Sequence, residues 1–178
     1  MQEPQFVKNY RDDEVLRKSF SVLAMGTFEI SFEEWYQKGF WNERYIPYSY
    51  VQGDQVVANV SVNSLDLVIE GEQKRAIQIG TVMTHPDYRR RGLSASLMNK
   101  VLEDYENQYD VMYLFANESV LDFYPRFGFQ AVDEQLFTMN ATPSQLEPTG
   151  IRRLNVNDVD DLHSFINSYR SDCRFHSA

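Results

Sequence analysis

Cysteine, basic side chains and long apolar runs are all scarce in this sequence. Cys173 is the only cysteine among 178 residues, which excludes a disulfide framework and a cysteine-rich metal site. The chain has only 17 Lys and Arg residues but 26 Asp and Glu residues. Its formal net charge of -9 therefore repels nucleic acid and anionic membranes. No apolar run approaches the roughly 20 residues of a membrane-spanning helix. We therefore expect no bound metal, no nucleic acid and no membrane partner.

The remaining composition is that of a folded protein. Hydrophobic residues make up 43% of the chain and aromatic residues 14%, which is enough to build the core of one domain or slightly more. Residues 1–14 are polar and charged, which predicts no secretory signal and a cytoplasmic location.

Strand and helix signals alternate along residues 1–140. Asp12 and Asp13 are N-cap candidates for a first helix. Two apolar segments, Val56–Ile69 and Ala76–Thr84, flank a turn at 70–72 and predict an antiparallel hairpin. The first half of the chain thus predicts antiparallel strands.

The second half predicts a strand-helix-strand unit. A helix follows the hairpin from Leu93, and Val111–Ala116 is an apolar run typical of a central strand buried on both faces. A short helical stretch before Pro125 should end there, and Gly128 suits a left-handed turn into a last strand pair around Phe129–Met139. The fold class expected is therefore α/β (α+β).

Beyond residue 140 the amino-acid composition of the chain changes. Residues 141–150 hold two prolines, a glycine and polar side chains, which is typical of a linker. Residues 151–178 then restart with a strand at Ile151–Leu154 and a helix capped by Asn157-Asp158. This segment is either the start of a second domain in a longer protein or a C-terminal helix that docks on the domain formed by residues 1–140.

Three consecutive arginines stand where a strand meets a helix. Arg89–Arg91 precede Gly92, a run of small residues and the helix from Leu93. A helix N-terminus carries partial positive charge, so arginines there repel it and one another. A multiply charged anion resolves this conflict, because free amides and cations converge on it. The segment predicts a phosphate-bearing ligand.

Three elements together resemble the GNAT superfamily of N-acetyltransferases. They are the strand Ile79–Thr84, the Arg-x-x-Gly-x-Ser element at Arg89–Ser94, and the Phe-Tyr-Pro-Arg-Phe-Gly-Phe stretch at Phe123–Phe129. The resemblance implies a mixed, mostly antiparallel central sheet with helices on both faces and a splayed strand pair that binds acetyl-CoA. A GNAT domain at 1–140 followed by the start of another domain is also similar to multidomain acetyltransferases of the enhanced-intracellular-survival type.

The resemblance implies acetyl-CoA as co-substrate and assigns residues to it. The strand is expected to bend at a bulge near Gly80 and Thr81, where glycine is well suited. Ser94 departs slightly from the Gly or Ala that relatives carry at the last motif position. The cofactor contacts implied are Val82, Met83, Thr84, Arg89, Arg90, Arg91, Gly92, Leu93, Ser94 and Asn117.

Tyr124 is the catalytic candidate that the resemblance implies. Attack by an amine on the thioester expels a thiolate, and a phenol held by the turn at Pro125 can protonate it. The alternative is that Tyr124 only packs between strand and helix. The general base is not visible, because the strand where many relatives carry a glutamate reads Ala76-Ile77-Gln78-Ile79. His85, a carboxylate outside this chain and a water chain stay open, although His85 fits an ordinary surface histidine better.

The acetyl acceptor expected is a small-molecule or peptide amine. Four residues of the aromatic, acidic segment 28–50 are candidates for binding a cation: Glu29, Glu33, Trp35 and Tyr36. The helical spacing of the aromatic residues favours a core role instead. A non-catalytic acyl-CoA-binding regulatory module is the alternative function, and a homo-oligomer is left open.

Overall fold

The computed structural model describes residues 3–69, 71–133, 138 and 152–172. These residues form two compact units, the first made of residues up to 67 together with 73–130, and the second of 68–72 with the residues from 131 onward. The predicted linker at 141–150 lies outside the described residues.

A five-stranded mixed sheet organises the first unit. Its strands run in the order β1 (Gln5–Lys8), β2 (Tyr45–Gln52), β3 (Gln55–Ile69), β4 (Glu72–Thr84) and β5 (Val111–Leu114). The β1–β2 and β2–β3 pairs are antiparallel, whereas β4 and β5 are parallel. The connection from β3 to β4 is too short for a parallel crossover, which confirms the predicted hairpin.

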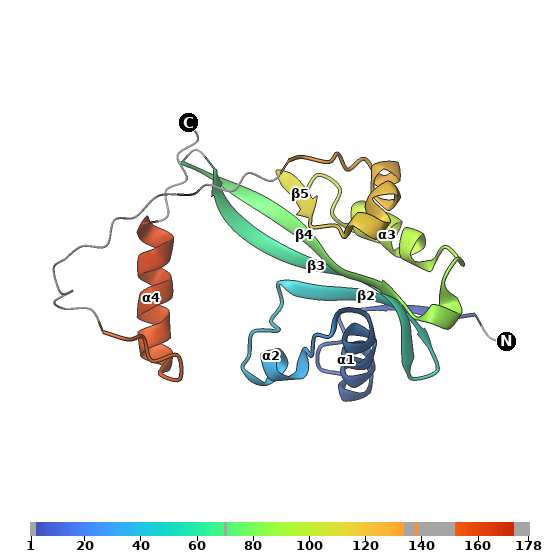
Figure 1. Ribbon diagram of the computed structural model, residues 1–178, viewed down its shortest axis with the longest axis horizontal. Helices are drawn as coiled ribbons and strands as arrows, with labels where there is room; N and C mark the ends of the chain where they lie inside the picture. The colour runs from blue at the N-terminus through green and yellow to red at the C-terminus, as the bar shows by residue number, and fades with distance from the viewer. Residues whose placement is uncertain (1–2, 70, 134–137, 139–151, 173–178) are drawn as a thin grey trace. The chain divides into compact units, whose positions relative to one another are not determined.

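Helices cover both faces of the sheet (Figure 1). Helices α1 (Glu14–Phe28) and α2 (Glu33–Gln37) lie on one face, and α3 (Leu93–Asp104) lies on the other. The N-cap of α1 is Asp13, whose carboxylate accepts from the amides of Val15 and Leu16 at 3.0 Å each. Short 3-10 turns are η1 (Pro86–Tyr88), η2 (Glu118–Phe123) and η3 (Pro125–Phe127).

Each face of the sheet has its own core. Phe20, Leu23 and Trp41 pack on the α1 side, and Leu97 and Val101 pack on the α3 side. All five side chains are buried. This two-layer burial gives the sheet a fixed position between α1 and α3.

Strand β4 changes the face that its alternate residues present. Ile77 and Ile79 pack in the α3 core, and uninterrupted alternation would put Met83 there as well. Met83 is instead buried in the α1 core, while Val82 packs on the α3 core. The reversal falls between Ile79 and Val82, where Thr81 has a φ of 44°. A β-bulge inserts one extra residue in this way, so β4 is bulged at the predicted place.

Two expectations about strands need correction. Val111–Ala116 was expected to be a central strand buried on both faces. In the sheet formed by the described residues, β5 stands at an edge, its side chains are half-buried and Phe115 is 72% exposed. A run of apolar residues predicts that its side chains avoid water, but it does not predict whether the strand lies at the centre or at the edge of the sheet. Of the last strand pair predicted around Phe129–Met139, residues 129–133 and 138 are not in strands and the others lie outside the described residues.

The second unit contains helix α4 (Val159–Asp172). Asp158 caps it as predicted, because its carboxylate accepts from the amides of Asp160 and Asp161 at 3.0 and 3.2 Å. The guanidinium of Arg152 pairs with Asp161. The strand predicted at Ile151–Leu154 is wrong for residues 152–154, which have no strand structure. No helix among the described residues is long and apolar enough to cross a membrane.

Candidate active site

A cavity of about 520 Å³ opens where β4 and β5 diverge. Their pairing ends at Ile79 and Leu114, directly before the bulge, and both residues line the cavity. The end of α1 contributes Thr27 and Phe28. The cavity also brings together seven of the residues predicted for the site: Val82, Met83, Thr84, Arg89, Ser94, Asn117 and Tyr124.

Four other residues predicted to bind the cofactor do not line this cavity. Arg90, Arg91, Gly92 and Leu93 instead form the segment that leads from η1 into α3. The hydroxyls of Thr84 and Ser94, 2.6 Å apart, join β4 to the first turn of α3 and place this segment beside the cavity. A long ligand in the cavity would therefore reach the arginine segment at the end marked by Arg89.

The bulge in β4 falls at Gly80 and Thr81, as expected, but its positive φ is not carried by the glycine. The left-handed conformation belongs to Thr81, and Gly80 has an ordinary negative or extended φ. A threonine with positive φ is strained, because its branched side chain crowds the backbone there. Four hydrogen bonds hold Thr81: its carbonyl accepts from Asn59 Nδ2 at 2.9 Å, and its hydroxyl contacts Tyr45, Asn59 and Ser61.

The start of α3 is arranged to receive an anion. The N-cap is Gly92 at φ 75°, and it offers no side-chain acceptor to the amides of the first turn. Arg89 donates to the carbonyl of Thr84 at 3.3 Å, and Arg91 donates to the carbonyl of Asp87 at 2.7 Å. Among the described residues, no carboxylate pairs with any of the three arginines. Free amides and unneutralised cations fit the pyrophosphate of a CoA ester.

Tyr124 also lines the cavity and lies between η2 and η3. Only 8% of the residue is exposed, and its ring contacts Phe123 and Phe129 with centroids 5.2 and 6.2 Å away. Burial raises the pKa of the phenol above its ordinary value of about 10, so the hydroxyl stays protonated at neutral pH. No described residue forms a hydrogen bond with this hydroxyl, which leaves it available to a ligand.

Two of the four residues predicted to hold a cationic acceptor, Glu33 and Tyr36, contact the buried cation Arg17. The buried guanidinium of Arg17 lies 3.7 Å from the ring centroid of Tyr36, and its Nε is 3.4 Å from a carboxylate oxygen of Glu33. Trp35 and Tyr36 pack on the α1 core, and the exposed Glu29 forms the C-cap of α1. None of these four predicted residues lines the 520 Å³ cavity. The aromatic, acidic pattern thus has a structural explanation in Arg17.

The cavity lining holds no visible base. Among the described residues that line it, Arg89 is the only charged one, and there is no carboxylate or imidazole. His85 lies outside the lining, where its Nδ1 accepts from the amide of Asp87 at 3.4 Å. The described part of the chain also has no group of three or more His, Cys, Asp or Glu side chains placed to hold a metal ion.

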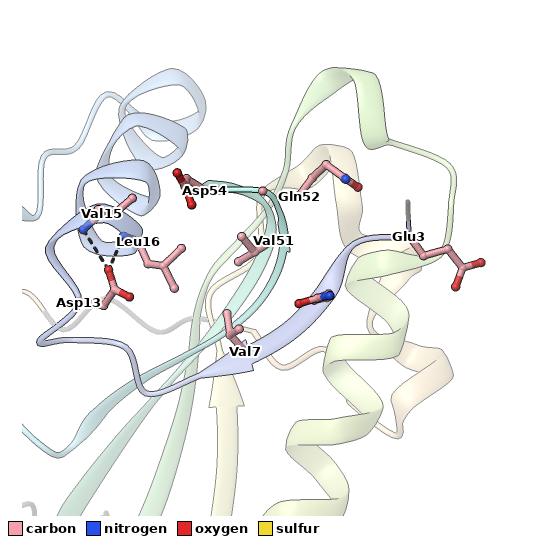
Figure 2. A pocket seen from close by; sticks show the side chains of 10 residues that line it. Glu3, Val7, Asp13, Val15, Leu16, Val51, Gln52 and Asp54 are labelled. Carbon is pink, nitrogen blue, oxygen red and sulfur yellow. Dashed lines mark hydrogen bonds between the residues drawn. The ribbon is translucent and has the colours of Figure 1, made fainter. Parts of the chain in front are cut away.

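Thr27 and Phe28 also line the cavity, although neither was predicted from the sequence. They end α1 and reach β4 only through the packing of that helix on the sheet, for which the sequence carries no local signal. A second cavity, of about 420 Å³, lies between β1, the start of α1 and the β2–β3 turn (Figure 2). It holds none of the predicted site residues. The Asp13 carboxylate in it is engaged as the N-cap of α1.

A bulged strand, a splayed strand pair and an uncapped helix after an arginine element are the features that the resemblance to GNAT acetyltransferases predicts. Residues 14–132 match the family model described as the acetyltransferase (GNAT) domain. The chain therefore belongs to the GNAT family of acetyltransferases.

Known proteins with sequence or structural similarity agree with this assignment. N-alpha-acetyltransferase 50 of Danio rerio is 28% identical over 111 residues, which are 60% of this chain and 57% of that protein. The match thus spans little more than half of that relative. A predicted acetyltransferase from Clostridium acetobutylicum, solved with acetyl-CoA, has a TM-score of 0.59 at 18% identity, over 76% of this chain and 95% of its own.

A larger protein shares the same fold. A probable N-acyltransferase from Enterococcus faecalis has a TM-score of 0.59 and 20% identity, over 71% of this chain but 32% of its own. The region of that protein that resembles this chain thus makes up about a third of its length.

Proposed function

We propose that this GNAT protein transfers the acetyl group of acetyl-CoA to a primary amine by direct attack, with Tyr124 as the general acid. The observation that carries the proposal is the single cavity that joins Tyr124, the bulged end of β4 and the start of α3. The amine, the thioester and the acid must meet within a few ångströms for this chemistry, and a cavity between splayed strands that Tyr124 lines supports such an arrangement.

The cofactor binds along β4 in this proposal. The amides at the start of α3 and the guanidinium groups of Arg89, Arg90 and Arg91 receive its phosphates. Backbone groups of Val82 and Thr84 pair with the pantetheine arm, as a neighbouring strand would, because β5 has already diverged there. The thioester then lies between the bulge at Thr81 and the segment from Asn117 to Tyr124.

The transfer is balanced in atoms and protons. The amine nitrogen forms a bond to the thioester carbonyl carbon, the C–S bond breaks, and the CoA sulfur leaves as a thiolate. Tyr124 donates its proton to that sulfur and is reprotonated from solvent, while the amine gives one proton to water. The products are an N-acetylated amine and free CoA.

Two measurements on the wild-type protein test this function. Calorimetric titration with CoA should show saturable binding, and turnover with acetyl-CoA over a panel of small amines and peptides should release free thiol. Absence of binding would overturn the cofactor site. Binding without turnover of any amine would favour an acyl-CoA-binding regulatory module.

The chain's place in a larger protein is part of the proposal. We infer that residues 1–140 are the acetyltransferase domain and that 151–178 either begin a second domain or dock on the first. The Enterococcus faecalis protein supports the former arrangement, because a GNAT-like region occupies about a third of its chain. Expression of 1–140 alone with retained CoA affinity would support this boundary, and insolubility of that fragment would contradict it.

A further inference from the structure

A chain of hydrogen-bonded polar side chains crosses the α1 face of the sheet beneath the bulge. It runs from the hydroxyl of Tyr10 to Ser49 at 2.7 Å, and from Ser49 to Asn59 at 2.8 Å. Asn59 then donates to Ser61 at 2.9 Å, and the hydroxyl of Thr81 donates to Ser61 at 2.7 Å. Ser49, Asn59 and Ser61 are fully buried. Such a group of polar side chains in a core is costly unless each member has a partner.

The amide of Asn59 is the centre of this chain. Its oxygen accepts from Ser49, and its nitrogen donates both to Ser61 and to the backbone carbonyl of Thr81 at 2.9 Å. At a bulge the sheet ladder is interrupted, so a backbone carbonyl there needs another donor. Asn59 supplies it from the neighbouring strand. It does so from outside the cavity, because it is not among the lining residues.

We propose that Asn59 is a positioning residue for acetyl-CoA, which holds Thr81 in its left-handed conformation and thereby keeps β4 splayed from β5. The inference rests on the proposed cofactor site along β4. The physical reason is that a threonine does not adopt positive φ without external restraint. The restraint consists of the bond to its carbonyl and the bonds to its hydroxyl from the same polar chain. Release of Thr81 would allow β4 to straighten into the space that the pantetheine arm requires.

The test compares CoA affinity and acetyl-CoA kinetics in three variants. We expect Asn59→Ala to raise the Kd for CoA at least tenfold, with the change in KM for acetyl-CoA larger than the change in kcat. Asn63→Ala is the matched control, because Asn63 lies on the same strand and contacts Gln78 at 3.4 Å, away from the bulge. Its Kd should stay within twofold of wild type. Thr81→Gly added to Asn59→Ala should restore much of the lost affinity, since glycine adopts positive φ without strain.

The outcomes separate this inference from the proposed function. Wild-type protein that does not bind CoA would overturn the cofactor site itself. Wild-type binding together with an unchanged Kd in Asn59→Ala, or with no recovery on adding Thr81→Gly, would overturn the role of Asn59 alone. If Asn59→Ala does not fold, Ser49→Ala provides the test, because it removes the donor to the Asn59 oxygen, together with the partner of the Tyr10 hydroxyl, and leaves the bond from Asn59 to the Thr81 carbonyl in place. It should raise the Kd about threefold, and an unchanged Kd would refute the inference.

Discussion

Replacement of Tyr124 by phenylalanine isolates the chemical step. The Tyr124→Phe variant keeps the ring that packs on Phe123 and Phe129 and removes only the hydroxyl. That hydroxyl has no hydrogen-bond partner among the described residues, so its loss leaves no buried group unsatisfied. The free energy of unfolding should therefore change by less than about 1 kcal/mol. The affinity for CoA should also stay the same, because the phosphate end of the site is unaltered.

Two pKa values show how the Tyr124 hydroxyl can stabilise the departing thiolate, and from this the loss of kcat in Tyr124→Phe can be judged. The ordinary pKa of a phenol, about 10, exceeds that of a thiol, about 8.5, and burial raises the pKa of Tyr124 further. Complete proton transfer to the thiolate is thus uphill by at least about 2 kcal/mol. The benefit comes from a hydrogen bond to the charge that develops on sulfur, which in a water-poor site contributes about 3 kcal/mol. We expect kcat to fall roughly 100-fold or more, with little change in the KM for acetyl-CoA.

The assay measures thiol release at saturating acetyl-CoA for wild type, Tyr124→Phe and Tyr109→Phe. Tyr109 is a suitable control because it is half-buried and packs on the α3 core, outside the cavity. It should retain full kcat. A wild-type kcat that falls only above pH 10 would agree with an acid whose pKa is raised. A kcat for Tyr124→Phe within threefold of wild type, or an equal loss in Tyr109→Phe, would refute the acid role.

Three further predictions concern charge and burial. Arg90→Gln should raise the Kd for CoA about tenfold and weaken its salt dependence, whereas Lys100→Gln, on α3 over the ring of Phe6, should not; equal effects would contradict a phosphate role. In chemical unfolding, Arg17→Met should lose about 2 to 4 kcal/mol and Glu33→Gln less than about 1, because the Glu33 carboxylate is partly exposed; a raised acceptor KM in Glu33→Gln would instead revive the predicted acceptor pocket. Burial raises the pKa of Tyr45 to about 12, so its stabilising effect is complete below pH 10 and is lost as pH rises towards 12; because other buried tyrosines also lose stability in this range, the test is that the loss between pH 9 and pH 12 is smaller in Tyr45→Phe than in wild type by about 2 to 3 kcal/mol.

Features governed by neighbouring residues were predictable from the sequence. The cap at Asp13, the helix from Leu93 and the left-handed turn at Gly128 each depend on a few adjacent side chains. The parallel pair of β4 and β5 follows from the helix that connects them. Strand β2 was missed, because its aromatic residues merge with those of the preceding helical segment and hide its alternation.

Features that depend on distant partners were not predictable in the same way. The bulge was located correctly near Gly80 and Thr81, but the sequence does not show that Thr81 adopts its left-handed conformation. Local propensity favours glycine, whereas the restraint on Thr81 comes from Asn59, more than twenty residues away. The acidic, aromatic segment does contact a cation, because Glu33 and Tyr36 bind a guanidinium, but that guanidinium belongs to Arg17 of helix α1. A sequence pattern shows what a group can bind and leaves open whether the chain itself provides the ligand.

The change of face in β4 has a consequence for which deletions in this strand would preserve the two cores. Up to Ile79, odd-numbered residues face α3, and from Thr81 onward they face α1. Removal of Gly80 alone would return the strand to strict alternation and still leave Ile79, Val82 and Met83 in the cores they now occupy. One extra residue in the middle of a strand thus separates a regular β4 from the bulged β4 on which the proposed cofactor site depends.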